Sequence, residues 1–382
     1  MPSPDPDPPA EGDAPLRYAR TPSDSDPRRD PKLLDAIARI APGTRLRSGI
    51  DDIIRSHEGA LIVIGDPAEL AFLYSGGLAL DVPFTPQLLF ELAKMDGAII
   101  INESASRISY ANVQLMPDPT IASAETGTRH RTAERVAKQT SALVISISQQ
   151  RETVTIFVDS LRYKLDRVPD VLAKANQALA TLDTYRQRLE QALTRLTALE
   201  FQNAVVLDDV LSVVQRAEMT TRMAEEIERD CVELGSEGRL IQLQLDELVT
   251  ELPTEKRMVI YDYHTGGSKD ADDALERLGG YGYQDLLETE FLAQLLGFPR
   301  TVNPLDQAVS PRGYRVLSHV PRLSETVLRH VVDAFDGLDA ITRATQRELE
   351  AVEGVGPARG RDIREGLRRL QEHNLVERYL QL

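Results

Sequence analysis

The chain has 382 residues, of which 42% are hydrophobic, and this length suits two or three domains with their own cores better than one compact domain. Its formal net charge of −16 excludes a protein that coats nucleic acid along its whole surface. The single cysteine, Cys231, excludes an intramolecular disulfide framework and a cysteine-rich zinc site.

Residues 1–30 are rich in proline and aspartate and contain no apolar run. Because they offer too little apolar surface to offset the entropy lost on ordering, we expect a disordered tail over 1–30 and a folded chain from near Lys32. Neither a stretch of about 18 apolar residues nor the apolar core of a signal peptide occurs. We therefore expect a cytoplasmic protein that makes no contact with membranes.

Residues 31–168 alternate helical segments with short apolar runs, a pattern typical of an α/β domain around a central mixed sheet. Between the first two apolar runs, Thr85 and Pro86 predict the start of a helix. The apolar stripe of that helix leads the chain directly to Asp96. The clearest strands are expected at 60–64, 98–101, 143–147 and 154–158.

Residues 169–310 change to long, charged helices. Leucines at a/d spacing between 172 and 196 predict a helix that packs along one seam. A second helical run ends near Leu234, and a third covers 240–252 and is expected to be closed by Pro253. The simplest interpretation of this region is an all-α linker bundle that has a structural role and no site of its own.

Residues 311–382 hold 12 arginines against 11 acidic residues, so the net negative charge lies elsewhere in the chain and we place any DNA contact here. The segments 319–323 and 352–356 each precede a helix with apolar residues at helical spacing, which predicts a duplicated helix–hairpin–helix unit. The first segment lacks the hairpin glycines, so we expect only the second to hold the hairpin geometry.

A cationic helix start is predicted after Gly127, with Thr128 as its N-cap. The free N–H groups and positive dipole end of such a helix suit phosphate binding, and Arg129, His130 and Arg131 add charged donors. Basic residues are unfavourable at a helix N-terminus without an anion, which favours a phosphate site. The alternative is an exposed basic helix start that binds nothing.

The second motif, Asp96-Gly97-Ala98, lies between a helix and a strand, where ligands commonly bind at the end of a sheet. Gly97 would let a ligand approach the backbone, and Asp96 could activate a hydroxyl or hold a divalent metal ion. By itself, an Asp-Gly pair more often indicates only a turn.

The C-terminal hairpin motif precedes a helix expected from Pro357 to Leu370. Its two glycines would let the backbone approach a DNA phosphate, and arginines that follow supply positive charge. Such contacts position DNA without reading its sequence, and the alternative is a hairpin used for packing or protein contacts. The residues expected to contact DNA are Gly354, Val355, Gly356, Arg359, Arg361 and Arg364.

Asp96-Gly97-Ala98 followed by Arg129-His130-Arg131 resembles the motif pair of the diadenylate cyclase family, and the C-terminal hairpin extends the resemblance to its DNA integrity scanning branch. The resemblance covers most of the chain from about Lys32. It implies a bacterial enzyme that condenses two ATP molecules into cyclic di-AMP and two pyrophosphates, with Mg²⁺ or Mn²⁺. It also implies cyclase domains that face each other in a homo-octamer, association with the nucleoid, and down-regulation of synthesis by branched or damaged DNA.

The family's catalytic roles carry over to four residues. By resemblance, Asp96 activates the ribose 3′-hydroxyl and holds the metal ion, while Arg129, His130 and Arg131 hold the phosphates. The competing hypothesis is a non-catalytic, nucleotide-binding scaffold for DNA repair, against which the intact motifs argue. The remaining ATP-binding residues implied by the resemblance are Gly97, Ala98, Leu115, Thr128, Thr132 and Ser148.

Overall fold

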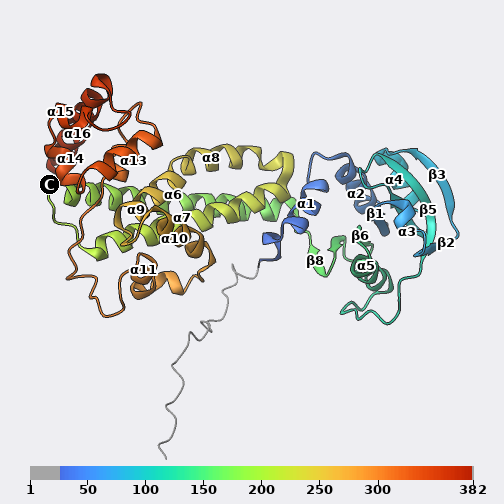
Figure 1. The fold of residues 1–382 in the computed structure, drawn as a ribbon. Coiled ribbons are helices and arrows are strands. Elements are labelled where there is room, and N and C mark those ends of the chain that lie inside the picture. Colours follow the sequence, from blue (N-terminus) through green and yellow to red (C-terminus); the bar gives the residue numbers. More distant parts are fainter. Residues whose placement is uncertain (1–25, 381–382) are drawn as a thin grey trace, which may run out of the picture. The chain divides into compact units, whose positions relative to one another are not determined.

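The computed structural model describes residues 26–380 (Figure 1). Of the tail expected over 1–30, residues 1–25 lie outside the described residues. The chain divides into two units, which we name the sheet unit (Pro27–Arg195 with Arg216–Lys256) and the helical unit (Leu196–Gln215 with Arg257–Leu382). The predicted domain limits at 168 and 310 remain predictions.

Order begins earlier than the sequence suggests. The 3-10 helix η1 (Pro27–Arg29) precedes Lys32, and the side chain of Arg28 is buried. Its Nη1 atom lies 2.6 Å from Asp230 Oδ1 and 3.3 Å from Glu233 Oε2. The expectation of a disordered tail is therefore wrong for the residues of η1, which the structure orders with a buried, ion-paired Arg28.

The sheet unit is built on a mixed sheet whose strand order is β2-β5-β4-β1-β6-β7-β8, with β3 also paired to β5. β1 and β4 run parallel, and the other paired strands run antiparallel. The four predicted strands are confirmed as β1, β4, β6 and β7. The strands are β1 (Ala60–Ile64), β2 (Tyr74–Ser75), β3 (Leu78–Pro83), β4 (Ala98–Ile101), β5 (Arg107–Leu115), β6 (Leu143–Ser148), β7 (Thr153–Val158) and β8 (Leu161–Lys164).

Helices cover both faces of this sheet (Figure 1). Ile62 and Ile64 of β1 belong to the core beneath α1, α2 and α4, whereas Leu61 and Val63 belong to the core beneath α5. Every residue of β1 is buried as a result, which explains its unbroken apolar sequence. The predicted Thr85 cap of α4 is confirmed. These helices are α1 (Pro31–Arg39), α2 (Arg45–Arg55), α3 (Pro67–Leu70), α4 (Pro86–Ala93) and α5 (Thr128–Gln139).

The predicted leucine seam is confirmed in α6 (Val168–Phe201), where Leu179 and Leu182 join a buried cluster with residues of α7 (Leu207–Leu234) and α8 (Arg239–Val249). A short 3-10 turn, η2 (Gly235–Gly238), connects α7 to α8.

Pro253 does not close a helix as predicted. It lies in the first turn of α9 (Leu252–Tyr263). Proline is tolerated there because the backbone N–H groups of the first turn form no hydrogen bond within the helix.

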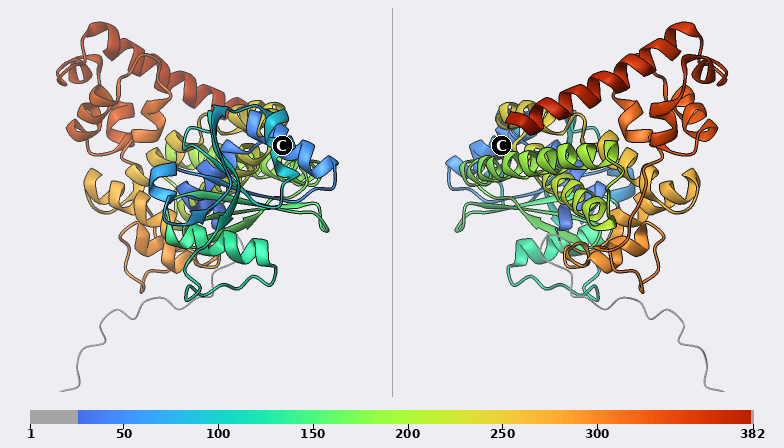
Figure 2. Two further views of the ribbon diagram at one scale, coloured as in Figure 1. Left: turned by 90° about the vertical axis from the view of Figure 1, so that its right-hand side faces the viewer. Right: turned by 90° about the vertical axis from the view of Figure 1, so that its left-hand side faces the viewer.

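The helical unit continues as short helices followed by one long helix, α16, which Figure 2 shows in red. α16 extends beyond its predicted end at Leu370. The elements are α10 (Ser268–Gly280), η3 (Asp285–Leu287), α11 (Thr289–Leu295), α12 (Tyr314–Ser318), α13 (Glu325–Ala334), α14 (Leu338–Arg343), α15 (Gln346–Glu350) and α16 (Pro357–Leu380).

Two connections in this unit each contain a residue with positive φ. Gly354 has φ +81° in the connection before α16, and Arg322 has φ +67° in the connection before α13. Each residue stands at the same distance in sequence from the helix that follows. The first segment thus adopts a positive φ at an arginine, at a cost of about 1–2 kcal/mol, and the expectation that only the second segment holds the hairpin geometry stays a prediction.

Candidate nucleotide-binding site

A cavity of about 540 Å³ opens in the sheet unit where the start of β4, the end of β5 and the N-terminus of α5 meet. Residues from both predicted motifs line it, although they are about thirty positions apart in the sequence. The predicted residues brought together are Asp96, Gly97, Ala98, Leu115, Thr128, Arg129 and Thr132. Leu61, Asn112, Val113 and Gln114 also line it, and sequence reasoning missed them.

Asn112 fixes the backbone of the first motif. Its Oδ1 atom accepts a hydrogen bond of 3.0 Å from Gly97 N, and a Cβ atom on Gly97 would overlap the Asn112 backbone. Gly97 is therefore needed for the close approach of β5, whereas the sequence suggested close approach of a ligand. Asn112 itself has φ +55° in the middle of a strand, a position that strand propensity does not anticipate. The neighbouring Asp96 is exposed at the cavity.

The N-terminus of α5 is uncapped. Its N-cap residue is Gly127 and not Thr128 as predicted, and within the described part of the chain no side chain accepts from its first N–H groups. Thr128 instead occupies the first helical position and lines the cavity. The free N–H groups and the positive end of the helix dipole thus meet the cavity without a competing side-chain oxygen.

Arg129 supplies the cavity with an unneutralised cation. Its side chain is half-buried, and the absence of a side chain at Gly59, just before β1, leaves room for its guanidinium. Among the described residues, no carboxylate forms an ion pair with Arg129. A half-buried cation beside an uncapped helix start favours an anionic ligand.

His130 is not among the residues that line the cavity, and its ring lies 6.5 Å from the ring of Phe157 in an edge-on arrangement. Burial is the main cause that lowers the pKa of His130 below its usual value. Glu125 opposes this shift, whereas the cations Arg162 and Arg129 add to it. The lowered pKa favours the neutral ring near pH 7, whereas the sequence suggested that His130 adds a charged donor.

Two further predicted residues are absent from the lining. Arg131 is exposed and donates from Nε to Glu125 O and from Nη2 to Thr126 O, both at 3.3 Å. Ser148 ends β6, and its hydroxyl accepts a hydrogen bond of 3.4 Å from Arg151 N. Arg131 and Ser148 are thus not among the residues that line the cavity.

Asp96 is the one carboxylate in the lining, and among the described residues no group of three or more His, Cys, Asp or Glu side chains is arranged to hold a metal ion. Protein-bound Mg²⁺ keeps several waters and commonly takes one or two carboxylates together with substrate phosphates. A single carboxylate beside a phosphate-binding helix start fits an ion that arrives with a nucleotide.

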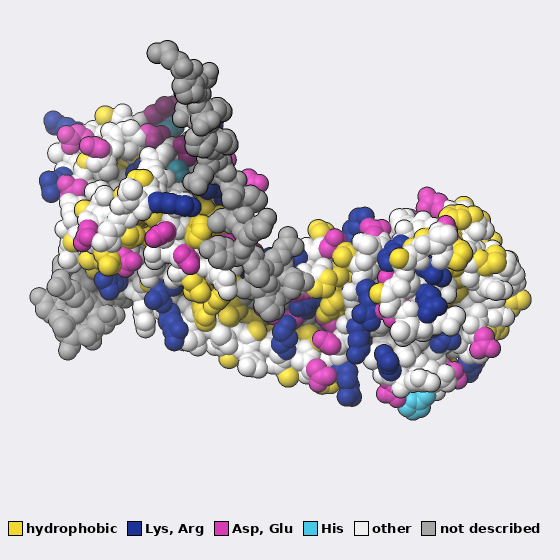
Figure 3. All heavy atoms as spheres, turned by 90° about the horizontal axis from the view of Figure 1, so that it is seen from below, with side chains coloured by type: hydrophobic (Ala, Val, Ile, Leu, Met, Phe, Trp, Pro, Cys, Tyr) yellow, Lys and Arg dark blue, Asp and Glu magenta, His cyan; other side chains and the backbone are white. Residues whose placement is uncertain are grey.

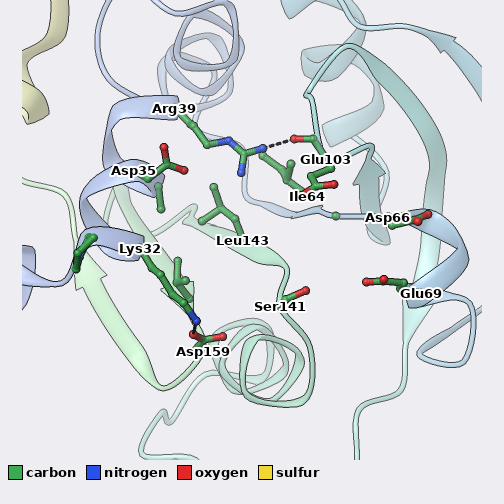
Figure 4. A pocket seen from close by; sticks show the side chains of 14 residues that line it. Lys32, Asp35, Arg39, Ile64, Asp66, Glu69, Glu103, Ser141, Leu143 and Asp159 are labelled. Atoms are coloured by element: carbon green, nitrogen blue, oxygen red, sulfur yellow. Dashed lines mark hydrogen bonds and ion pairs between the residues drawn. The ribbon is translucent and has the colours of Figure 1, made fainter.

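A second cavity, of about 620 Å³, lies beyond the carboxyl end of β1, next to α1 (Figure 4). Its two cations are engaged, since Lys32 Nζ lies 2.5 Å from Asp159 Oδ2 and Arg39 donates to Glu103 O. Carboxylates outnumber these cations, and such a lining repels a triphosphate. Charge therefore favours the slightly smaller cavity at Asp96 as the nucleotide site. The carboxylates here are Asp35, Asp66, Glu69, Glu103 and Asp159.

The predicted DNA-contacting residues divide by exposure. Gly354 and Gly356 are exposed, and a side chain at Gly356 would meet open space. Val355 is 3% exposed and its N–H donates to Val352 O, so its side chain anchors the turn and offers DNA no contact surface.

The arginines after the turn are exposed, but they differ in their contacts. Arg359 Nη1 donates to Gly354 O at 2.7 Å and so braces the turn, whereas Arg361 and Arg364 project from α16. His330 of α13, which sequence reasoning missed, lies 3.1 Å from Glu353 O through its Nδ1 atom.

No helix in the described part of the chain is both long and apolar enough to span a membrane.

Comparison with known families agrees with this geometry. Residues 47–161, which include the cavity, match a family model described as the DisA bacterial checkpoint controller nucleotide-binding region. Residues 165–305 match the model of the DisA bacterial checkpoint controller linker region. The fold and the cavity thus define a nucleotide-binding domain joined to a helical linker.

Curated relatives extend the match over nearly the whole chain. The DNA integrity scanning protein DisA of Carboxydothermus hydrogenoformans is 48% identical over 90% of this chain and 98% of its own length. The proteins of that name from Frankia alni and Bacillus subtilis are 47% and 46% identical, over 90% and 91% of this chain and 96% of each relative. This chain belongs to the DisA family.

Proposed function

We propose that this protein is a diadenylate cyclase, which joins two ATP molecules into cyclic di-AMP and releases two pyrophosphates. The observation that supports it is one cavity that combines an exposed carboxylate, Asp96, with the uncapped start of α5 and with Arg129, a cation that pairs with no carboxylate of the described residues. Attack of a 3′-hydroxyl on an α-phosphate needs a group that takes the proton and cations that balance the phosphate charge. This cavity offers both.

Each residue then has a role. Asp96 accepts the proton of the 3′-hydroxyl and supplies a ligand for Mg²⁺ or Mn²⁺, an ion that would neutralise phosphate charge when bound. Arg129 and the first N–H groups of α5 bind the phosphates. Neutral His130 packs against Phe157 and so helps to position the N-terminus of α5. Leu115, Thr128 and Thr132 contact the nucleoside, with Gly97 and Ala98 forming the floor.

The product requires two copies of the site. Cyclic di-AMP contains two phosphodiester bonds, so each ATP supplies one attacking hydroxyl and one α-phosphate, and two identical cavities facing each other satisfy both attacks. Phe72 and Met116 are 64% and 52% exposed, and Met116 follows Leu115 of the cavity directly. Figure 3 shows a group of hydrophobic side chains on the surface of the sheet unit. Such a patch suits coverage by a second copy, as a building block of an octamer.

We further propose that the two turns before α13 and α16 belong to helix–hairpin–helix motifs that bind DNA backbones, with preference for branched or damaged DNA. Gly354 and Gly356 would contact phosphates, and Arg361 and Arg364 would supply charge. Bound DNA lowers cyclase activity, and the protein acts in the cytoplasm at the nucleoid. A scaffold that binds nucleotide and DNA without catalysis is the alternative.

The test is incubation of the purified protein with ATP and either Mg²⁺ or Mn²⁺, with the products separated by chromatography. Asp96→Asn should lose cyclic di-AMP formation by at least about 100-fold, because it removes the proton acceptor. Glu69→Gln, which changes an exposed carboxylate of the second cavity, should retain activity. Activity in Asp96→Asn would overturn the role of Asp96. No product from the wild type with either metal would favour the scaffold.

A further inference from the structure

One side of α5 carries a row of polar side chains at helical spacing: Arg131, Glu134, Arg135, Lys138 and Gln139. These positions share one face of the helix. All of them bind the connection between β5 and α5, which runs beneath α5 in Figure 1. We name residues 118–126 of this connection the strap.

The contacts run along the strap in the direction opposite to α5. Arg131 holds the carbonyls of Glu125 and Thr126 at 3.3 Å. Glu134 accepts from Ala124 N at 3.1 Å and from the Ser123 hydroxyl at 2.5 Å.

The remaining three side chains bind the earlier part of the strap. Arg135 Nε and Lys138 Nζ donate to Ile121 O and Ala122 O, each at 2.9 Å. Gln139 accepts from Asp118 N at 3.0 Å. The strap has no regular secondary structure, so these side chains satisfy backbone groups that a sheet or helix would otherwise pair.

The strap connects two parts of the cavity lining. It follows Leu115 and precedes Thr128, and both of these residues line the cavity. Clamping the strap to α5 therefore fixes two walls of the cavity relative to each other. Glu125 is also paired with Arg162 of β8, which ties the strap to the sheet.

Arg129 and Arg131 point to different tasks. Two residues separated by two positions lie about 200° apart around a helix, so side chains at these positions cannot face the same ligand without bending back. Arg129 is half-buried in the cavity lining, whereas Arg131 is exposed and holds strap carbonyls.

We propose that Arg131 is a positioning residue, which holds the strap so that Leu115 and Thr128 form the nucleoside-binding walls, while Arg129 alone of the two arginines binds phosphate. The proposal rests on the nucleotide site put forward above. It departs from the expectation that both arginines bind phosphate.

The test compares the affinities of the full-length protein for ATP and for adenosine, measured by calorimetry. Arg129→Met should weaken ATP binding by about 10-fold or more and leave adenosine binding unchanged. Arg131→Met should weaken both by the same factor. Lys138→Met, which releases Ala122 O farther along the strap, is a second variant of the same contacts and should resemble Arg131→Met in a milder form.

Hydrogen exchange on the same variants reports the clamp directly. Amides of residues 118–126 should exchange faster in Arg131→Met and Lys138→Met than in the wild type or in Arg129→Met. Loss of ATP affinity in Arg131→Met with unchanged adenosine affinity, or unchanged exchange in the strap, would overturn the proposal. If the wild type binds no ATP, the proposed function fails, and the exchange result still decides whether Arg131 holds the strap.

Discussion

At the scale of single residues, position relative to the cavity separates members of one motif. Arg129, His130 and Arg131 are consecutive, yet the first lines the cavity, the second packs its ring against Phe157 and the third binds the strap. Sequence alone predicted the helix start that carries them, because its signals are local. It could not predict where each of the three side chains points, because this depends on which neighbours α5 packs against.

His130 makes stability depend on pH. Because burial lowers its pKa below the usual value near 6.5, the unfolded chain takes up a proton at a higher pH than the folded chain. The stabilising contribution is thus complete above about pH 6.5 and declines as the pH falls below it. The melting temperature should fall between about pH 7.5 and pH 5.5, and less so in His130→Gln. Equal falls in both proteins would contradict the buried, neutral state of His130.

At the scale of elements, strands buried on both faces were predictable and edge strands were not. β1 and β4 are continuous apolar runs, and α4 begins at a Thr-Pro cap that is visible in the sequence. β3 is exposed or half-buried along its length, so no apolar run marks it.

Contacts between elements explain another segment that sequence reasoning left without a role. The η2 turn between α7 and α8 docks on the connection between α1 and α2, where Ser236 N donates to Pro42 O at 2.9 Å. Gly235 has φ +51°, and a Cβ atom on it would overlap Pro42 O. Only the folded chain brings these two turns together, so the need for glycine there could not be read from local sequence.

The hairpin before α16 is the proposed contact with DNA, and its role can be tested by mutation. Four-way-junction DNA should lower the turnover of the wild-type cyclase, and Gly356→Asp should remove this inhibition, because it places a carboxylate where a phosphate would lie. The side chain has open space, so the fold should tolerate it. Gly279→Asp adds the same charge at another open position, in α10, and should leave inhibition intact. Inhibition that persists in Gly356→Asp would contradict the hairpin as the DNA contact.

At the scale of the whole molecule, charge is unevenly distributed along the chain. The chain carries a net charge of −16, while residues 311–382 have nearly balanced charge with many arginines. DNA contacts should therefore be local and should weaken steeply with salt. α6 and α7 each contribute residues to both units, and their leucine seam was predictable because the a/d repeat is a property of the sequence.

The central claim is that the Asp96 cavities of two facing copies join two ATP molecules through their 3′-hydroxyls. The most direct measurement is pyrophosphate release from 3′-deoxy-ATP and from 2′-deoxy-ATP, each with Mg²⁺ or Mn²⁺. The account predicts that 3′-deoxy-ATP competes with ATP but releases no pyrophosphate, because it lacks the attacking group, whereas 2′-deoxy-ATP still gives a cyclic dinucleotide. Pyrophosphate released from 3′-deoxy-ATP as fast as from ATP would mean that another nucleophile attacks the phosphate, and would contradict the account.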